Sequence, residues 1–245
     1  LLQDELLGWL RRSQAATRSG DRTQTSAVAQ EFEDLVGRVR QARLEAPPTQ
    51  DITSELMHTR VEGRLLDLRE LASVLRNWTV GEVGTIAASI GILLHWLASH
   101  LDWQQRLRAQ PGLLPTAIDE VLRIDGPLVA NRRITTRDVT LGGCPVPMGE
   151  RLSIHWIAAN RDPRVFGDPD EFRMDRDPAL NLLYGAGIHV CPGAPLARLE
   201  LRVLMEELLA RTSAIALPAG HAPTRATAPD AGYAALRVRL HQTPA

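Results

Sequence analysis

The sequence predicts a mainly α-helical protein with small β-sheets in its second half. Apolar residues recur at helical spacing through most of the first 125 positions. Beyond Gly126-Pro127 the pattern changes to short alternating pieces bounded by glycine and proline. A glycine-rich stretch at positions 184–193 then leads directly into another helical pattern. This order places a helical region first, a small sheet second, and a loop and helix last.

Five helices are expected in the first half. They cover Leu1 to about Thr17, Ala27–Leu44, a short segment capped near Asp51, about 67–100, and Leu113–Ile124. Ser19-Gly20-Asp21 separates the first two, and Pro47-Pro48 ends the second. The fourth is longer than most globular helices, which indicates a central helix that crosses the domain.

The second half contains short strands, coil and one long helix. Gly142-Gly143 and Met148-Gly149 are typical of hairpin turns. The segment 162–178 is rich in Pro, Asp and Arg and lacks periodicity, which indicates ordered coil. A helix to about Arg211 and a terminal strand over Ala235–Leu240 complete the chain.

We expect one domain over residues 1–245. Its helical part spans 1–125 and includes the central helix at about 67–100, its small sheet and coil span 126–178, and its cysteine loop, long helix and terminal strand span 179–245.

Composition excludes several classes of function. The net charge is -1, and all 28 Lys or Arg residues are arginines scattered among acids, so nucleic-acid binding is not expected. The two cysteines lie far apart and no signal-peptide pattern precedes them, which favours a cytoplasmic location. The longest apolar region, 83–101, is interrupted by polar residues and glycines, so we expect a core helix and no membrane span.

One thiol lies on a glycine-rich loop directed at a helix start. The stretch reads Tyr184-Gly185-Ala186-Gly187-Ile188-His189-Val190-Cys191-Pro192-Gly193. The positive end of the following helix would stabilise a thiolate at Cys191. A single thiolate without a second soft ligand fits haem iron better than zinc or an iron–sulfur cluster. The alternative is an ordinary buried cysteine.

This stretch resembles the haem-binding loop of the cytochrome P-450 superfamily, of bacterial type. The resemblance implies a P-450-like helical fold that is incomplete at the N-terminus, and haem b (iron protoporphyrin IX) with Cys191 as the ligand of its iron. Tyr184 stands where the family usually has Phe, and the implied cofactor-binding residues are Tyr184, Gly185, Gly187, His189, Cys191, Gly193 and Arg133. His189 and Arg133 match the positions that meet the haem propionates.

Glu120 and Arg123 lie three residues apart, hence on one helix face, where a carboxylate and a guanidinium can pair. Most such pairs are solvated surface contacts. Their position resembles the family's Glu-x-x-Arg helix, and Arg176 matches the arginine that completes a structural triad. The implied role is to fix the coil that supports the cysteine loop.

The long helix departs from the family pattern. Aligned on Gly81, Val83 occupies the position of the family's acid and Gly84 that of its alcohol. Glu82 and Thr85 each lie one residue away and are the candidate catalytic, proton-relaying residues. The substrate positions that the resemblance implies are Gly81, Gly84, Leu128, Val129, Ala130 and Tyr233.

The resemblance implies a haem-thiolate monooxygenase that inserts one oxygen atom from O2 into a small hydrophobic substrate. Electrons would come from a ferredoxin or reductase, because the sequence has no flavin or iron–sulfur motif. Two alternatives stay open: a peroxide-driven haem-thiolate oxygenase, and a shortened, non-oxygenating haem or interaction protein. Self-association or a partner would cover the surface that the missing N-terminal portion leaves open.

Overall fold

The computed structural model describes residues 2–46, 50–228 and 231–242. Pro47 and Pro48, the expected helix terminators, lie outside these residues. The chain divides into two compact units, Leu1–Val83 and Gly84–Ala245, and the boundary falls within one long helix.

The first unit is helical. It contains α1 (Leu2–Ser19), α2 (Arg22–Glu45), α3 (Ile52–His58), the short antiparallel strands β1 (Arg60–Val61) and β2 (Arg64–Leu65), and the start of α4 (Leu68–Ser99). Asp21 caps α2 by accepting a hydrogen bond from the N–H of Thr23. The rings of Trp9 and Phe32 pack in the core in a tilted arrangement with their centroids 4.4 Å apart, and the Trp9 indole donates to the carbonyl of Val28 at 2.8 Å.

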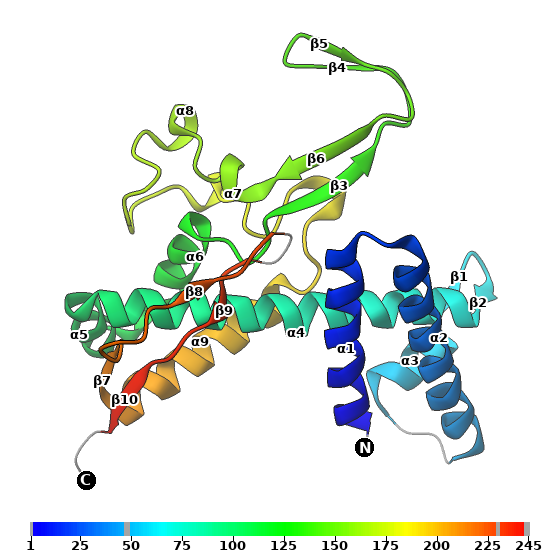
Figure 1. Cartoon of the computed structure of the whole chain (residues 1–245), viewed down its shortest axis with the longest axis horizontal. Helices are drawn as coiled ribbons and strands as arrows, with labels where there is room; N and C mark the ends of the chain where they lie inside the picture. Colours follow the sequence, from blue (N-terminus) through cyan, green and yellow to red (C-terminus); the bar gives the residue numbers. More distant parts are fainter. Residues whose placement is uncertain (1, 47–49, 229–230, 243–245) are drawn as a thin grey trace. The chain divides into compact units, whose positions relative to one another are not determined.

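The second unit adds shorter helices and four two-stranded antiparallel sheets (Figure 1). Its helices are the rest of α4, α5 (Leu101–Ala109), α6 (Leu114–Ile124), α7 (Trp156–Ala159), α8 (Pro163–Phe166) and α9 (Ala194–Arg211), with 3-10 turns η1 (Pro111–Leu113), η2 (Pro178–Leu180) and η3 (Gly187–His189). Its strands are β3 (Ala130–Ile134), β4 (Val139–Leu141), β5 (Cys144–Val146), β6 (Arg151–His155), β7 (Thr212–Ala216), β8 (Thr224–Arg225), β9 (Tyr233–Ala235) and β10 (Arg239–Gln242). They pair as β3–β6, β4–β5, β7–β10 and β8–β9.

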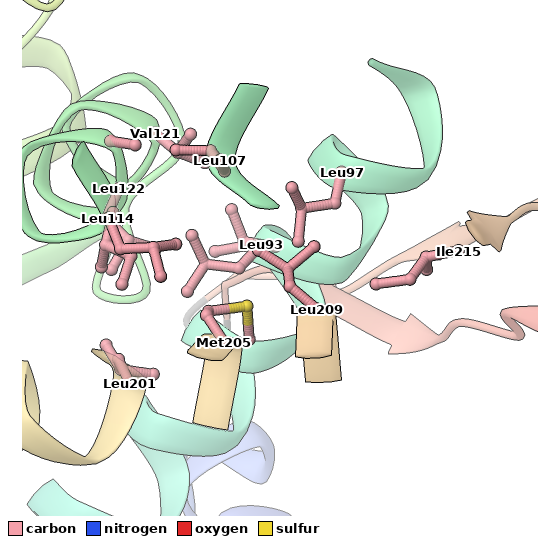
Figure 2. Packing of buried hydrophobic residues seen from close by; sticks show 13 residues of the cluster. Leu93, Leu97, Leu107, Leu114, Val121, Leu122, Leu201, Met205, Leu209 and Ile215 are labelled. Carbon is pink, nitrogen blue, oxygen red and sulfur yellow. The ribbon is translucent and has the colours of Figure 1, made fainter. Parts of the chain in front are cut away.

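The core of the second unit lies where α4, α5, α6 and α9 meet. Figure 2 shows the side chains that these helices and β7 contribute to it. The labelled members are Leu93, Leu97, Leu107, Leu114, Val121, Leu122, Leu201, Met205, Leu209 and Ile215. Several are about 2 % exposed or less, so this cluster anchors the segments that carry the site.

The mainly α class with small sheets is confirmed, and the expected central helix agrees closely with α4. The expected strand over Ala235–Leu240 is wrong in extent. β9 pairs with β8 whereas β10 pairs with β7, so the chain leaves one sheet before it enters the other. Helix α5 was not predicted, because its buried face includes the polar Gln104, whose amide bonds the carbonyls of Leu97 and Ile215.

Within the described residues, α4 is the one helix long and apolar enough to cross a membrane by length and composition. The core helix of a soluble protein can also meet these criteria of length and composition. Here the C-terminal half of α4 buries Ile92, Leu93 and Leu97 in the core.

Candidate functional site

The Cys191 loop is closed by its own backbone. The N–H of Cys191 donates to the carbonyl of Tyr184 at 2.8 Å, and the N–H of Ala194 donates to the carbonyl of Cys191 at 3.3 Å. Helix α9 begins at Ala194, so the cysteine lies just before a helix N-terminus, the end of the helix dipole that carries partial positive charge. The thiol is exposed, and the interpretation of Cys191 as a buried core residue is therefore wrong.

Glycines shape this loop. Gly185 and Gly187 have φ angles of 74° and 65°, a backbone conformation that L side chains rarely adopt. A Cβ on Gly185 would come within 3.4 Å of the His189 carbonyl and 4.0 Å of the Trp156 ring. A Cβ on Gly193 would come within 3.8 Å of the Cys191 sulfur. The glycines thus allow the turn and keep side chains away from the thiol.

The donor set of the loop fits haem. Among the described residues, no group of three or more His, Cys, Asp or Glu side chains is placed to hold a metal ion. Ile188 and Val190, beside the thiol in sequence, are 96 % and 53 % exposed. A single soft ligand with apolar neighbours would suit an iron whose remaining ligands come mainly from a porphyrin.

A buried ion-pair network joins α6 to the segment 160–176, most of which was expected to be coil but which contains the short helix α8. Arg123 donates to both carboxylate oxygens of Glu120, at 2.7 and 2.9 Å, and these side chains are 1 % and 6 % exposed. Arg176 donates to Glu120 at 3.0 Å and to the carbonyl of Phe166 at 2.8 Å. The structure therefore brings the three candidate triad residues together.

The network continues to the cysteine loop through Asn160. Arg123 donates to the Asn160 carbonyl at 2.6 Å, and the Asn160 side chain accepts from the N–H of Leu182 at 2.7 Å. Asn181 donates to the carbonyl of Asp119 on α6 at 3.1 Å. These bonds attach the start of the loop to α6 on the N-terminal side of Tyr184.

The two candidate propionate partners lie on separate elements. Arg133 is half-buried on β3, opposite Leu152 of β6, and its guanidinium donates to the Arg132 carbonyl at 2.9 Å. His189 is exposed at the end of η3. Both carry the donors that a carboxylate accepts, at positions open to solvent at least in part.

Helix α4 runs without interruption through the candidate relay segment. Gly81 and Glu82 belong to the first unit and are exposed, whereas Gly84 and Thr85 belong to the second and are half-buried. The carbonyl of Thr85 accepts a hydrogen bond from the Ser89 hydroxyl at 2.8 Å. Glu82 and Thr85 lie three positions apart in the sequence of α4.

Besides Gly84 on α4, the candidate substrate positions of the second unit lie on two segments. Leu128 is 39 % exposed, the Val129 carbonyl accepts from the N–H of Trp156 at 3.0 Å, and Ala130 begins β3. The Tyr233 ring packs 4.7 Å from the ring of His95, as measured between centroids.

Sequence reasoning missed several residues around the loop. The Trp156 ring lies where it would meet a side chain added at Gly185, and its indole donates to Asn131 at 2.5 Å. Arg198 lies 4.5 Å above the Tyr184 ring and pairs with Asp119 at 3.0 Å. Burial, with a smaller contribution from Asp119, raises the pKa of Tyr184 to about 12. Only the Asn160 segment carried a signal, since Ala-Asn-Arg-Asp-Pro resembles bacterial members of the superfamily.

Comparison with known proteins identifies the class. The family model described as Cytochrome P-450 matches residues 112–234, which include α6, the coil, the cysteine loop and α9. The chain belongs to this family.

Named relatives and solved structures agree. The chain is 37% identical over 195 residues to the cyclomarin C epoxidase CymV of Salinispora arenicola, covering 79% of this chain and 49% of the relative. It is 42% identical over 129 residues to a beta-dihydromenaquinone-9 omega-hydroxylase of Mycobacterium tuberculosis, covering 53% and 26%. The crystal structure of CYP108D1 from Novosphingobium aromaticivorans superposes with a TM-score of 0.86 at 27% identity, covering 98% of this chain and 57% of that one.

The chain thus spans about half the length of the curated epoxidase relative it matches.

Proposed function

We propose that this chain supplies the thiolate ligand and part of the substrate site of a haem-thiolate monooxygenase. The observation that carries the proposal is the exposed Cys191 thiol, on a loop joined to the buried Glu120–Arg123–Arg176 network. Haem b, when bound, supplies the activation of O2 and the oxidising power that amino-acid side chains lack. One oxygen atom of O2 enters a substrate C–H or C=C bond, and the other leaves as water with two electrons and two protons.

The residues of this chain would hold the cofactor and orient the substrate. Cys191 provides the thiolate, and the bond between its N–H and the Tyr184 carbonyl fixes where the sulfur lies. Arg133 and His189 would hold the carboxylates of the cofactor as hydrogen-bond donors. Glu82 and Thr85 would move protons between solvent and the site, since their side chains carry the required acid and hydroxyl.

The substrate is proposed to be a small hydrophobic organic molecule. The positions assigned to it, Gly81, Gly84, Leu128–Ala130 and Tyr233, are mostly small or apolar. The named relatives are an epoxidase and a hydroxylase, which agrees with oxygen insertion as the reaction class. A ferredoxin or reductase would supply the electrons. We place the chain in the cytoplasm, where such electron donors are found.

A peroxide-driven oxygenase is the second candidate. It is favoured by one observation: α4 is a regular helix at the relay segment, with Gly84 where the family has its alcohol. Hydrogen peroxide already contains the two electrons and two protons that O2 would have to receive. Oxygenation driven by peroxide therefore does not need residues that relay protons. Turnover with H2O2 in the absence of any reductase would favour it over the first candidate.

The deciding experiment is the visible spectrum of the haem-reconstituted chain, reduced and exposed to carbon monoxide. The proposal predicts a strongly red-shifted Soret band, the signature of a thiolate ligand. A band typical of neutral ligands, or no uptake of haem, would contradict the proposal and favour the non-oxygenating interaction protein.

Replacing Cys191 with serine tests the ligand itself. Because the thiol is exposed and makes no core contact, Cys191→Ser should abolish the red-shifted band and leave the far-UV circular dichroism unchanged. Cys144→Ser, which replaces the exposed cysteine of β5, is the matched control and should keep the band. An unchanged spectrum in Cys191→Ser would remove this residue from the site.

A further inference from the structure

The β8–β9 hairpin is too short to hold its own position. β8 has two residues and β9 has three, and their register is irregular between Thr224 and Arg225. Isolated two-stranded ribbons are marginal even when longer. Contacts with other elements must therefore determine where β9 lies (Figure 1).

Close backbone packing joins β9 to α4. Gly232 has a φ angle of 76°, and a Cβ there would come within 3.2 Å of the Ala88 carbonyl and 3.4 Å of Ile92. A Cβ on Gly91 would lie 3.9 Å from the Tyr233 ring. The start of β9 thus lies against residues 88–92 of α4, about one helical turn beyond Thr85.

Arg225 connects this contact to α6. Its guanidinium bonds the carboxylate of Asp125, the residue that ends α6, at 2.5 Å. The same guanidinium lies 4.4 Å from the centre of the Tyr233 ring, which it faces across the hairpin. Tyr233 in turn packs against His95 of α4. A continuous set of contacts therefore runs from α6 through Arg225 and Tyr233 to α4.

We propose that Arg225 is a positioning residue, which holds β9 against α4 through Asp125 and Tyr233 and thereby limits the bulk of the ligands that the site admits. The positioning role rests only on the contacts of Arg225 with Asp125 and Tyr233 and of β9 with α4. The limit on ligand bulk rests on the proposed haem-thiolate function, because it places the substrate beside the Gly84–Thr85 turn of α4. Loss of the Arg225 contacts frees β9 to move away from that turn.

The positioning role is tested by amide hydrogen exchange of the full chain. In Arg225→Leu the N–H of Ala226, which bonds the Gly232 carbonyl at 3.1 Å, should exchange about fivefold faster, as expected for one ion pair and one cation–π contact. Peptides from α9 should be unchanged. Arg237→Leu, which replaces an exposed arginine of the same terminal segment, is the control and should leave Ala226 unaffected.

A double-variant comparison separates the ion pair from a general loss of charge. If Arg225 acts through Asp125, Arg225→Leu combined with Asp125→Asn should accelerate exchange no more than Arg225→Leu alone. Arg225→Lys should restore part of the protection, since it keeps the charge. Wild-type exchange at Ala226 in Arg225→Leu would overturn the positioning role.

The ligand limit is tested by optical titration of the haem-loaded chain with imidazole and 4-phenylimidazole, which differ in bulk. Arg225→Leu should lower the ratio of the Kd for 4-phenylimidazole to that for imidazole by about threefold or more, while the reduced carbon monoxide band stays red-shifted. An unchanged ratio with faster exchange would overturn the ligand limit and keep the positioning role. Failure of the wild-type chain to show a thiolate band would count against the proposed function and the ligand limit, whereas hydrogen exchange would still decide the positioning role.

Discussion

At the scale of single residues, the chain concentrates its buried charge in one place. Glu120 accepts hydrogen bonds from two arginine side chains, and Arg123 also donates to the carbonyls of Asn160 and Pro169. A buried charge is tolerated when it is paired and hydrogen-bonded in this way. The network therefore orders the coil that leads into the cysteine loop.

Removing the Glu120 charge should be strongly destabilising. Within the described structure, Glu120→Gln leaves Arg123 buried without a counter-charge and leaves Arg176 paired with Asp168 alone, which should cost about 3–5 kcal/mol of unfolding free energy. Urea unfolding followed by far-UV circular dichroism measures the change. Glu206→Gln breaks an exposed pair with Arg202 and should cost about 0.5 kcal/mol or less. Equal losses in the two variants would contradict the structural role.

His95 should make the fold sensitive to acid. Burial, and then the charge of Arg225, lower the pKa of His95, while Asp125 opposes and His100 adds to the shift. The unfolded chain therefore binds a proton at a higher pH than the folded chain does. Stability should fall as pH drops through the ordinary histidine range near about 6.5, and level off below the folded pKa.

Urea unfolding midpoints at about pH 8 and about pH 5.5 measure this effect. His95→Gln removes the titrating group and should reduce the difference between the two midpoints. His221→Gln, at an exposed histidine, is the control and should not. The same pH dependence in His95→Gln as in the wild type would exclude this histidine as a source of the acid sensitivity.

At the scale of elements, α4 begins in the first compact unit and ends in the second. It contains glycines, which stabilise a helix less than alanine does. An added Cβ at Gly84 would meet no heavy atom within 4 Å, whereas one at Gly232 would press on the Ala88 carbonyl at 3.2 Å. Within the described structure, no neighbouring atom therefore requires a glycine at position 84. The close approach of β9 to α4 does require one at position 232.

Substitution at these two glycines should act in opposite directions. Gly84→Ala should stabilise the chain by about 0.5–1 kcal/mol, because alanine is the better helix former. Gly232→Ala should destabilise it, since its φ of 76° and the nearby carbonyl both disfavour a side chain. Thermal unfolding gives both signs. Destabilisation by Gly84→Ala would show that the helix needs the glycine for packing.

At the scale of the whole molecule, apolar side chains remain exposed on α9. Leu196, Leu199 and Val203 are 49 %, 48 % and 44 % exposed and recur at helical spacing. The net charge is -1, so little electrostatic repulsion separates two copies of the chain. Apolar surface of this kind favours association.

The chain should therefore self-associate in a concentration-dependent way near neutral pH. Sedimentation velocity measures the distribution of species. Leu199→Glu combined with Val203→Glu should shift it toward the monomer, because the new charges oppose burial of this face. Arg202→Glu on the same helix is the control for charge alone. A wild-type chain that is monomeric at all concentrations would contradict the prediction.

Part of the site was predictable because its signal is local. Cys191 and its glycines are adjacent in sequence, and the Glu120–Arg123 pair follows from helical spacing. Arg176, which lies 56 residues from Glu120, came only from the family resemblance, since spacing carries no information at that distance. Trp156 and Arg225 act through contacts between distant segments and their roles had no local pattern, whereas Asn160 lies in a segment that resembles bacterial members of the superfamily.

The sequence by itself determined the helical class, the long α4 and the thiol loop, because periodicity, turn residues and glycine spacing act over a few positions. Tertiary structure alone decided that Glu120 and Arg123 are buried, that Asn160 joins them to the cysteine loop, and that the terminal strand divides between two sheets. Each of these depends on which distant segments pack together. Pairing and burial of that kind are set by the whole core, and local propensity does not specify them.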